Sequence, residues 1–265
     1  GTTIRASNVG DDVDIDIIGA IKSIQFNAYA SGNLLADSIG KISSKFGHLG
    51  AQVIAYTGGI KSVIAAGSII GDITATNGDI KSISAGLNIQ GDIIASGNIG
   101  KVSTKVGDLS GVVSSGLSIT SISANNIIDA IIAAGTELKK VSVKLNMIDS
   151  YALSGYYLGF NGVFDSDDIT RNGNIGSIIV KGTFDSSYIG AAVLPATTLT
   201  TPYLLNTAEP NVNAFGQIKK VSFGSINYNG SDPFGLYASR NIKPFKVNKL
   251  LPDTIGSFEI EEYLS

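Results

Sequence analysis

A short pattern that returns about every 20 residues constrains this chain more than any other feature of its sequence. The pattern is an isoleucine or leucine, two small or basic residues, and then an isoleucine or valine. Copies begin at Ile21, Ile39, Ile60, Ile80, Ile99, Ile119 and Leu138, which lie 18, 21, 20, 19, 20 and 19 positions apart, and then at Ile175, Ile218 and Ile255, at spacings of 37, 43 and 37. A fixed period of this length is typical of solenoids, in which each repeat stacks on its neighbours.

The alternation of side chains within a repeat favours strands over helices. From Ile83 to Ile99 the odd-numbered positions are apolar or small, and residues 122–138 show the same alternation at even-numbered positions. A period of two is that of a strand, and it points Ile93 and Ile132 inward. We therefore predict an all-β, single-stranded parallel β-helix. Its variable coil length favours the right-handed form over the left-handed form, which is built from strict hexapeptide repeats.

Composition excludes several classes of function. The chain has no cysteine and a single histidine, so it can form neither a disulfide framework, nor a thiolate metal site, nor a site with several histidines. A net charge of −3 gives no electrostatic case for nucleic acid or an anionic membrane as the main partner. The longest apolar runs are too short for a transmembrane helix, so no membrane insertion is expected.

The aromatic residues and prolines divide the chain into two halves of one domain. Of the 20 phenylalanines and tyrosines, 16 follow residue 150, and all 6 prolines follow residue 190. We predict one domain over residues 1–265, with an N-terminal cap at 1–17, regular coils at 18–150, and coils with loop insertions and a C-terminal cap at 151–265. The first 17 residues break the repeat pattern. The expected loops are 156–173, 194–216 and 229–254, which hold the prolines and turn pairs such as Asn229-Gly230.

Two stretches carry a resemblance to a known group of proteins. The runs GDIKSISAGLNIQGDIIASGNIGKV and GIKSVIAAGSIIGDITATNG resemble the Gly/Ile/Asp/Ser-rich β-helix repeats of large bacterial secreted and cell-surface proteins. The resemblance covers residues 18–141 and implies secretion or a cell-surface location, with a structural or adhesive role. The partners it implies are polysaccharides or other surface proteins, self-association included. It carries no catalytic motif.

Aromatic residues of the second half are the candidate binding residues. The predicted loops and the coils beside them contain Tyr151, Tyr156, Tyr157, Phe160, Tyr203, Phe234 and Tyr237. A tyrosine ring offers apolar area and a polar hydroxyl at small entropic cost, which suits recognition. The alternative is that the rings pack beneath their own loops as small satellite cores.

Lysines recur once in most repeats: Lys22, Lys41, Lys61, Lys81, Lys101 and Lys140. They suit either a basic stripe for an anionic polysaccharide or a solvated edge that keeps the sheet soluble. The lysines stand at two different positions after the isoleucine and need not point the same way. Since the net charge is also negative, the solvated edge is the preferred interpretation.

Acidic residues provide the candidates for metal binding and catalysis. Asp72 and Asp92 lie 20 residues apart and would stack on adjacent coils, where a calcium ion or a solvated corner could reconcile their charges. No resident cofactor is expected; calcium is the candidate metal, with Asp165 and Asp167 as further weak ligands.

The alternative to a structural role is a polysaccharide lyase or glycosidase that acts on an acidic polysaccharide. Its catalytic residues would come from the densest acidic cluster within a predicted loop and the charged residues that follow it: Asp165, Asp167, Asp168, Arg171 and Asp185.

Overall fold

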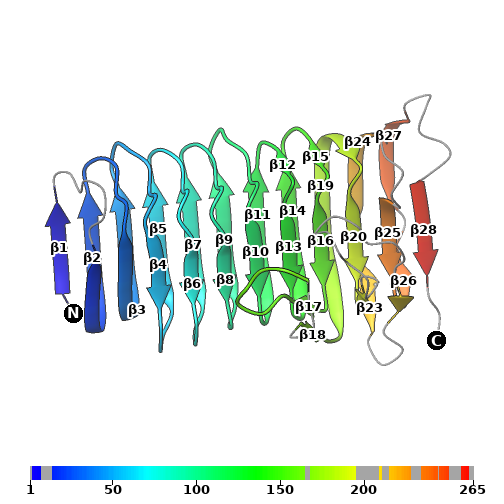
Figure 1. Ribbon diagram of the computed structural model, residues 1–265. Helices are drawn as coiled ribbons and strands as arrows, with labels where there is room; N and C mark the ends of the chain where they lie inside the picture. The colour runs from blue at the N-terminus through cyan, green and yellow to red at the C-terminus, as the bar shows by residue number, and fades with distance from the viewer. Residues whose placement is uncertain are drawn as a thin grey trace.

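The chain forms a parallel β-solenoid of about ten turns with coils of about 20 residues, as predicted. The computed structural model describes residues 2–6, 14–164, 168–194, 209–210, 215–227, 234–243, 245–250 and 258–262. Strands lie side by side along the rod, with the two termini at opposite ends (Figure 1). Over the described residues no helix is present that could cross a membrane.

Three parallel ladders run along the rod. The first contains β1 (Thr2–Ala6), β2 (Ile15–Phe26), β3 (Asn33–Ser44), β5 (Ile60–Ala65), β7 (Ile80–Ala85), β9 (Ile99–Thr104), β11 (Ser118–Ala124), β14 (Glu137–Val143), β19 (Gly173–Asp185), β23 (Gly216–Ile218), β24 (Val221–Asn227), β26 (Asn241–Ile242) and β27 (Lys246–Leu250). The second starts in the N-terminal halves of β2 and β3 and continues through β4 (Gln52–Ala55), β6 (Ile73–Ala75), β8 (Ile93–Ala95), β10 (Val112–Ser115), β13 (Ile131–Ala134), β16 (Tyr151–Ser154), β20 (Tyr188–Ala191), β25 (Phe234–Ala238) and β28 (Phe258–Glu262).

The third ladder lies at a corner and is narrower. Single-residue bridges join Ala30, Leu49, Ile69, Ile89, Leu109 and Ile127 in turn. The ladder then passes through β12 (Ile127–Ile128), β15 (Met147–Ile148) and the C-terminal end of β19. Two antiparallel pairs stand outside the ladders: β17 (Tyr156–Tyr157) with β18 (Ile169–Thr170), and β21 (Val193–Leu194) with β22 (Glu209–Pro210).

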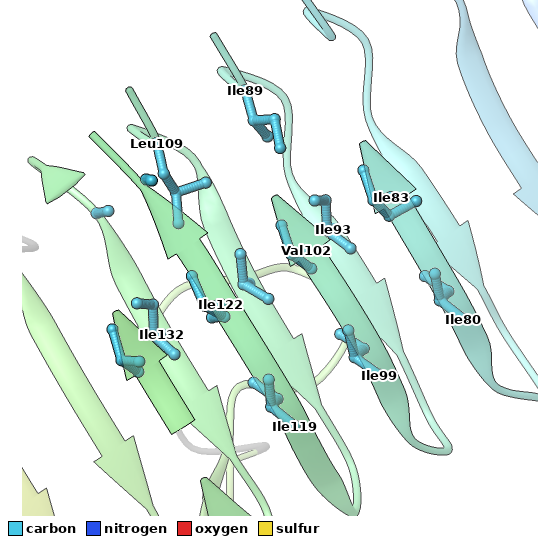
Figure 2. Close-up of a cluster of buried hydrophobic side chains, with 14 of the residues drawn as sticks. Ile80, Ile83, Ile89, Ile93, Ile99, Val102, Leu109, Ile119, Ile122 and Ile132 are labelled. Carbon is cyan, nitrogen blue, oxygen red and sulfur yellow. The ribbon is translucent and has the colours of Figure 1, made fainter. Parts of the chain in front are cut away.

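Stacked isoleucines fill the interior between the ladders (Figure 2). Ile80, Ile99 and Ile119 occupy equivalent positions on successive coils and are fully buried. Ile93 and Ile132 are 0 % exposed, which confirms their predicted inward direction. Full burial of each such side chain stabilises the fold by about 1.5–3 kcal/mol, and the same gain recurs on every coil.

Strict alternation fails at the corners. Leu87 was expected to point inward and is 43 % exposed, and Ile127 rather than Ile128 is the buried member of its pair. The backbone turns at these points, so the pleat that sends alternate side chains to opposite faces is interrupted. Gly91 fits one such corner because a Cβ there would lie 2.2 Å from the carbonyl oxygen of Gly71 on the preceding coil.

Polar side chains at the third-ladder corner bind the backbone of the next coil. The Ser68 amide donates a hydrogen bond to Nδ1 of His48 at 2.9 Å, and the Asn88 amide donates to the Ser68 hydroxyl at 3.3 Å. The same arrangement continues along the rod through the side chains of Asn88, Asp108, Asn126 and Asn146. These bonds satisfy amides that the narrow ladder would otherwise leave without an acceptor.

The widely spaced repeats of the second half are single coils with insertions. Ile175 pairs with Leu138, and Ile218 pairs with Ile175. The next equivalent residue is Ile242 rather than Ile255, because β25, β26 and β27 form one more coil. The prediction of a loop over 229–254 was therefore wrong. The range contains the strands of a further coil, and its repeat signature is hard to recognise in the sequence because it contains Pro244 and Phe245.

The N-terminal residues continue the ladders instead of breaking their pattern. β1 pairs with β2 in parallel, and Ile15 in β2 pairs with Leu34 in β3. The first coil thus starts earlier than residue 18, since a repeat without its Ile-x-x-Ile signature still pairs through backbone hydrogen bonds.

Candidate functional site

Between β16 and β19 the structure describes residues 155–164 and 168–172; these fold back over the outside of the second ladder, and we call them the first insertion. The Leu158 amide donates a hydrogen bond to the Ser114 hydroxyl at 3.3 Å, and Nη1 of Arg171 donates to the Gly116 carbonyl at 3.0 Å. A Cβ at Gly162 would contact Ile94 and Val112. The first insertion therefore covers the outer side of β8, β10 and β13 (Figure 1).

Three of the candidate binding tyrosines are buried. Tyr156, Tyr157 and Tyr237 are 6 %, 7 % and 2 % exposed. A second hydrophobic cluster forms between the rod and the insertions, with the members Ile131, Ala133, Leu153, Tyr156, Leu158, Tyr188, Val193 and Tyr237. Tyr156 and Tyr237 thus lie in a satellite core beneath the insertions, and the Tyr157 ring meets that of Phe160 edge to face, with centroids 6.1 Å apart. These rings are covered because the second ladder carries apolar outward residues, and their role in binding a partner stays a prediction.

The remaining candidate binding residues are distributed differently. Tyr151 is half-buried at the border of the second cluster, and its ring meets that of Phe164 edge to face, with centroids 6.1 Å apart. Phe160 is 47 % exposed at the tip of the first insertion. Phe234 lies in β25, paired with Phe258 of β28. Tyr203 lies outside the described residues.

A stacked pair of tyrosine rings packs between two of the later coils. The rings of Tyr188 and Tyr237 lie parallel, with centroids 4.5 Å apart and planes 11° from each other. A Cβ at Gly190 would lie 2.6 Å from the Tyr188 ring, so the ring occupies the space that any larger residue would fill. The sequence carried one signal for this packing, a tyrosine two residues before a glycine in an alternating strand.

The described members of the proposed catalytic group bind different structural partners. The Tyr156 hydroxyl donates to Oδ2 of Asp168 at 2.8 Å, within the first insertion. Asp185 accepts hydrogen bonds from Ser186 and Asn227 at a corner of the rod. Arg171 donates to a backbone carbonyl, as described above. Asp165 and Asp167 lie outside the described residues.

Backbone amides account for the stacked carboxylates of Asp72 and Asp92. The Asp92 amide donates to Oδ1 of Asp72, and the Val112 amide donates to Oδ1 of Asp92, each at 2.9 Å. Burial raises the pKa of Asp92, and the neighbouring Asp72 raises it further, while the Val112 hydrogen bond opposes both. Among the residues that the structure describes, no group of three or more metal-ligating side chains could hold an ion.

Another corner also gathers carboxylates. Burial raises the pKa of Asp149, with smaller contributions from Asp129 and Asp185 on the coils before and after it. Asp129 and Asp149 have positive φ angles of 51° and 46°. Aspartate tolerates this left-handed conformation better than most residues, so these carboxylates are explained by the turn.

The lysines form the most regular exposed feature of the rod. Ten of them, all exposed, form two adjacent columns on the outside of the first ladder. The first column contains Lys22, Lys61, Lys81, Lys139, Lys219 and Lys243. The second column contains Lys41, Lys101, Lys140 and Lys220. We call this surface the lysine face. The register places Lys41 beside Ser23 and Ser62, and Lys101 beside Ser82 and Ser121.

The one-residue offset between the lysines thus places them in neighbouring columns of the same surface. In two coils the first column has glycine and the second has lysine, at Gly40-Lys41 and Gly100-Lys101, whereas Gly176 is followed by Ser177. A Cβ at Gly100 would lie 2.2 Å from the carbonyl oxygen of Lys81, which confirms that Gly100 stacks directly on the lysine before it. The offset keeps Lys101 from standing directly opposite Lys81, whereas Lys61 and Lys81 stand opposite each other on adjacent coils, where like charges repel.

Charge is segregated on this rod. Ten six-residue segments of the first ladder contain no aspartate or glutamate, although acidic residues outnumber basic ones in the whole chain, 22 to 19. The segments begin at Ile21, Ile39, Ile60, Ile80, Ile99, Ile119, Leu138, Ile175, Ile218 and Ile242. In the described part of the chain the one ion pair of the lysine face joins Lys139 to Glu137, at 3.9 Å. A chain of negative net charge therefore presents one long surface whose charged residues are lysines, with Glu137 of β14 as an acidic residue at its border.

The fold and these surfaces define the class of protein as a parallel β-solenoid with one face covered and one open. No family model, curated protein or solved structure matches this chain.

Proposed function

We propose that this protein is a rigid, non-catalytic binding rod, a structural segment of a bacterial secreted or cell-surface protein that serves adhesion or assembly. The observation that carries the proposal is the lysine face, a regular polar surface that runs along the stacked coils and is separate from the insertions. A surface that repeats at every coil suits contact with an extended partner, because each coil adds an equivalent contact.

The bonding of the charged residues in the second half supports binding rather than turnover. Asp168 and Arg171 hold the first insertion in place, and Asp185 binds neighbouring side chains at a corner. A lyase or glycosidase needs its carboxylates to converge on substrate. Here the described candidates serve separate structural contacts.

The test is co-sedimentation of the 265-residue protein with insoluble polysaccharides, acidic and neutral, followed by analysis of the supernatant for new reducing ends and unsaturated uronic acids. We expect retention on at least one polymer with no product released. Released oligosaccharides would establish an enzyme, and a failure to bind every polymer would also overturn the proposal.

A further inference from the structure

We propose that the lysine face binds a linear polysaccharide that carries one carboxylate on each sugar unit, with the polymer lying parallel to the rod axis. This inference rests on the proposed function and names the partner and its orientation.

The spacing of the charges favours this orientation. Strands of a sheet are about 4.8 Å apart, so successive coils present their lysines at that interval along the axis. The ten coils carry ten lysines in the two columns, an average of one per coil. A linear polyuronate likewise carries one charge per sugar, and the length of a sugar unit is comparable with the strand spacing. A polymer laid across the strands can then meet a new ammonium group at nearly every unit.

The surroundings of the lysines suit a carbohydrate. Serines alternate with lysines in the second column, at Ser23, Ser62, Ser82, Ser121 and Ser177. Their hydroxyls can donate and accept hydrogen bonds, as sugar hydroxyls do. The face therefore offers a cation for the carboxylate and a neutral partner for the ring hydroxyls.

A role in solubility alone does not explain this arrangement. Lysines protect sheets mainly at unpaired edge strands, whereas most of these lysines lie on strands paired on both sides, such as β5, β7 and β9. Charges of both signs, interspersed, give a soluble surface without a single-sign field. Because these ten segments contain no acidic residue, the lysines repel one another, and an anionic partner would relieve this repulsion.

Nucleic acid fits the lysine face less well. Surfaces for single strands combine positive charge with aromatic side chains on which bases stack. The aromatic residues of the ten six-residue segments are Phe26 and Phe223, both buried in the interior, and Phe245, which is partly buried against it. Double-stranded DNA winds around its axis, so a straight row of lysines would meet its phosphates only at intervals.

The test compares variants of four lysines on neighbouring coils. Lys41→Gln, Lys61→Gln, Lys81→Gln and Lys101→Gln are combined in one protein, and a matched control carries arginine at the same positions. Binding to soluble polygalacturonate is measured by isothermal titration calorimetry at low and high salt, beside uncharged dextran, dextran sulfate and single-stranded oligothymidylate. Circular dichroism and the melting temperature establish that each variant is folded.

We expect the glutamine variant to bind polygalacturonate at least about tenfold more weakly, the arginine control to bind like the parent, and salt to weaken the parent's binding. Equal affinity of the glutamine variant would overturn the lysine face as the binding site while leaving the rod's binding function intact. Tighter binding to oligothymidylate or to dextran sulfate than to polygalacturonate would contradict the proposal that the partner is a carboxylated polysaccharide. Absence of binding to any polymer would overturn the proposed function as well.

Discussion

The two long outer faces of this rod are built on one interior and have opposite chemistry. Outside the first ladder, lysines and serines face solvent along the whole rod. Outside the second ladder, Ile94, Ile131 and Leu153 are buried beneath the first insertion or its neighbours, at 4 %, 7 % and 1 % exposure. The inward residues on both ladders are the same stacked isoleucines, valines and alanines.

This difference shows that the repeat constrains the interior and leaves the outside free. Inward positions must fill a fixed cross-section on every coil, so their side chains vary little. Outward positions contact only the neighbouring coils and whatever covers them. One face could therefore acquire charge while the other acquired an apolar covering, without change to the fold.

A substitution in the interior should reduce stability more than any substitution on the outer faces. Ile93→Asp places an unpaired charge at a position with 0 % exposure, and we expect it to destabilise the rod by about 4 kcal/mol. Chemical denaturation followed by circular dichroism measures the loss. Ser82→Lys on the open face is the control and should change stability by less than about 0.5 kcal/mol. A reversed order would place the inward residues one position away.

The covered face should respond more strongly than an open position of the same chemistry. Leu153→Ala removes a buried side chain between the rod and the first insertion, and we expect a loss of about 2–3 kcal/mol. Leu87→Ala is the matched control, because Leu87 is 43 % exposed. Similar melting temperatures for the two variants would mean that the first insertion leaves Leu153 open in solution.

Asp92 lies where the covering begins, and its substitution should stabilise the rod. Its pKa in the folded state is raised above 3.8, so the folded state holds this proton to a higher pH than the unfolded state does. Stability therefore falls as pH rises through the window between 3.8 and the raised pKa. Asp92→Asn removes the charge, keeps an acceptor for the Val112 amide, and adds a donor toward Asp72. We therefore expect the free energy of unfolding to rise by about 1 kcal/mol at neutral pH.

The gain should shrink at pH 3, where Asp92 is protonated in the folded protein. Melting temperatures of Asp92→Asn and the parent, compared at pH 7 and pH 3, measure it. The exposed Asp16→Asn is the control and should show no such dependence. An equal or larger difference at pH 3 would contradict the assignment of the effect to the Asp92 charge.

The sequence was sufficient to predict the ladders but not what lies on them. A fixed period with alternating isoleucines determines which residues stack, and the structure confirms it at Ile93 and Ile132. The burial of Tyr156 depends on the path of an insertion whose anchor is the Leu158 contact with Ser114, 44 residues away. No local pattern encodes a contact of that range.

The lysines of the lysine face are visible in the sequence, but their common surface is not. The net charge averages over the chain and hides the absence of acidic residues from the ten six-residue segments that carry the lysine face. The offset between Lys22 and Lys41 suggested different directions. Only the register shows that both positions lie between two inward isoleucines on the same outer surface.

The hydrogen-bonded corner gives the rod a polarity. From His48 to Asn146, each side chain accepts a bond from an amide on the coil that follows it. Any fragment cut within this region would therefore end differently at its two sides, with open acceptors toward the C-terminus and open amide donors toward the N-terminus. Two such fragments complement each other head to tail and mismatch head to head, so the rod has a built-in direction of growth.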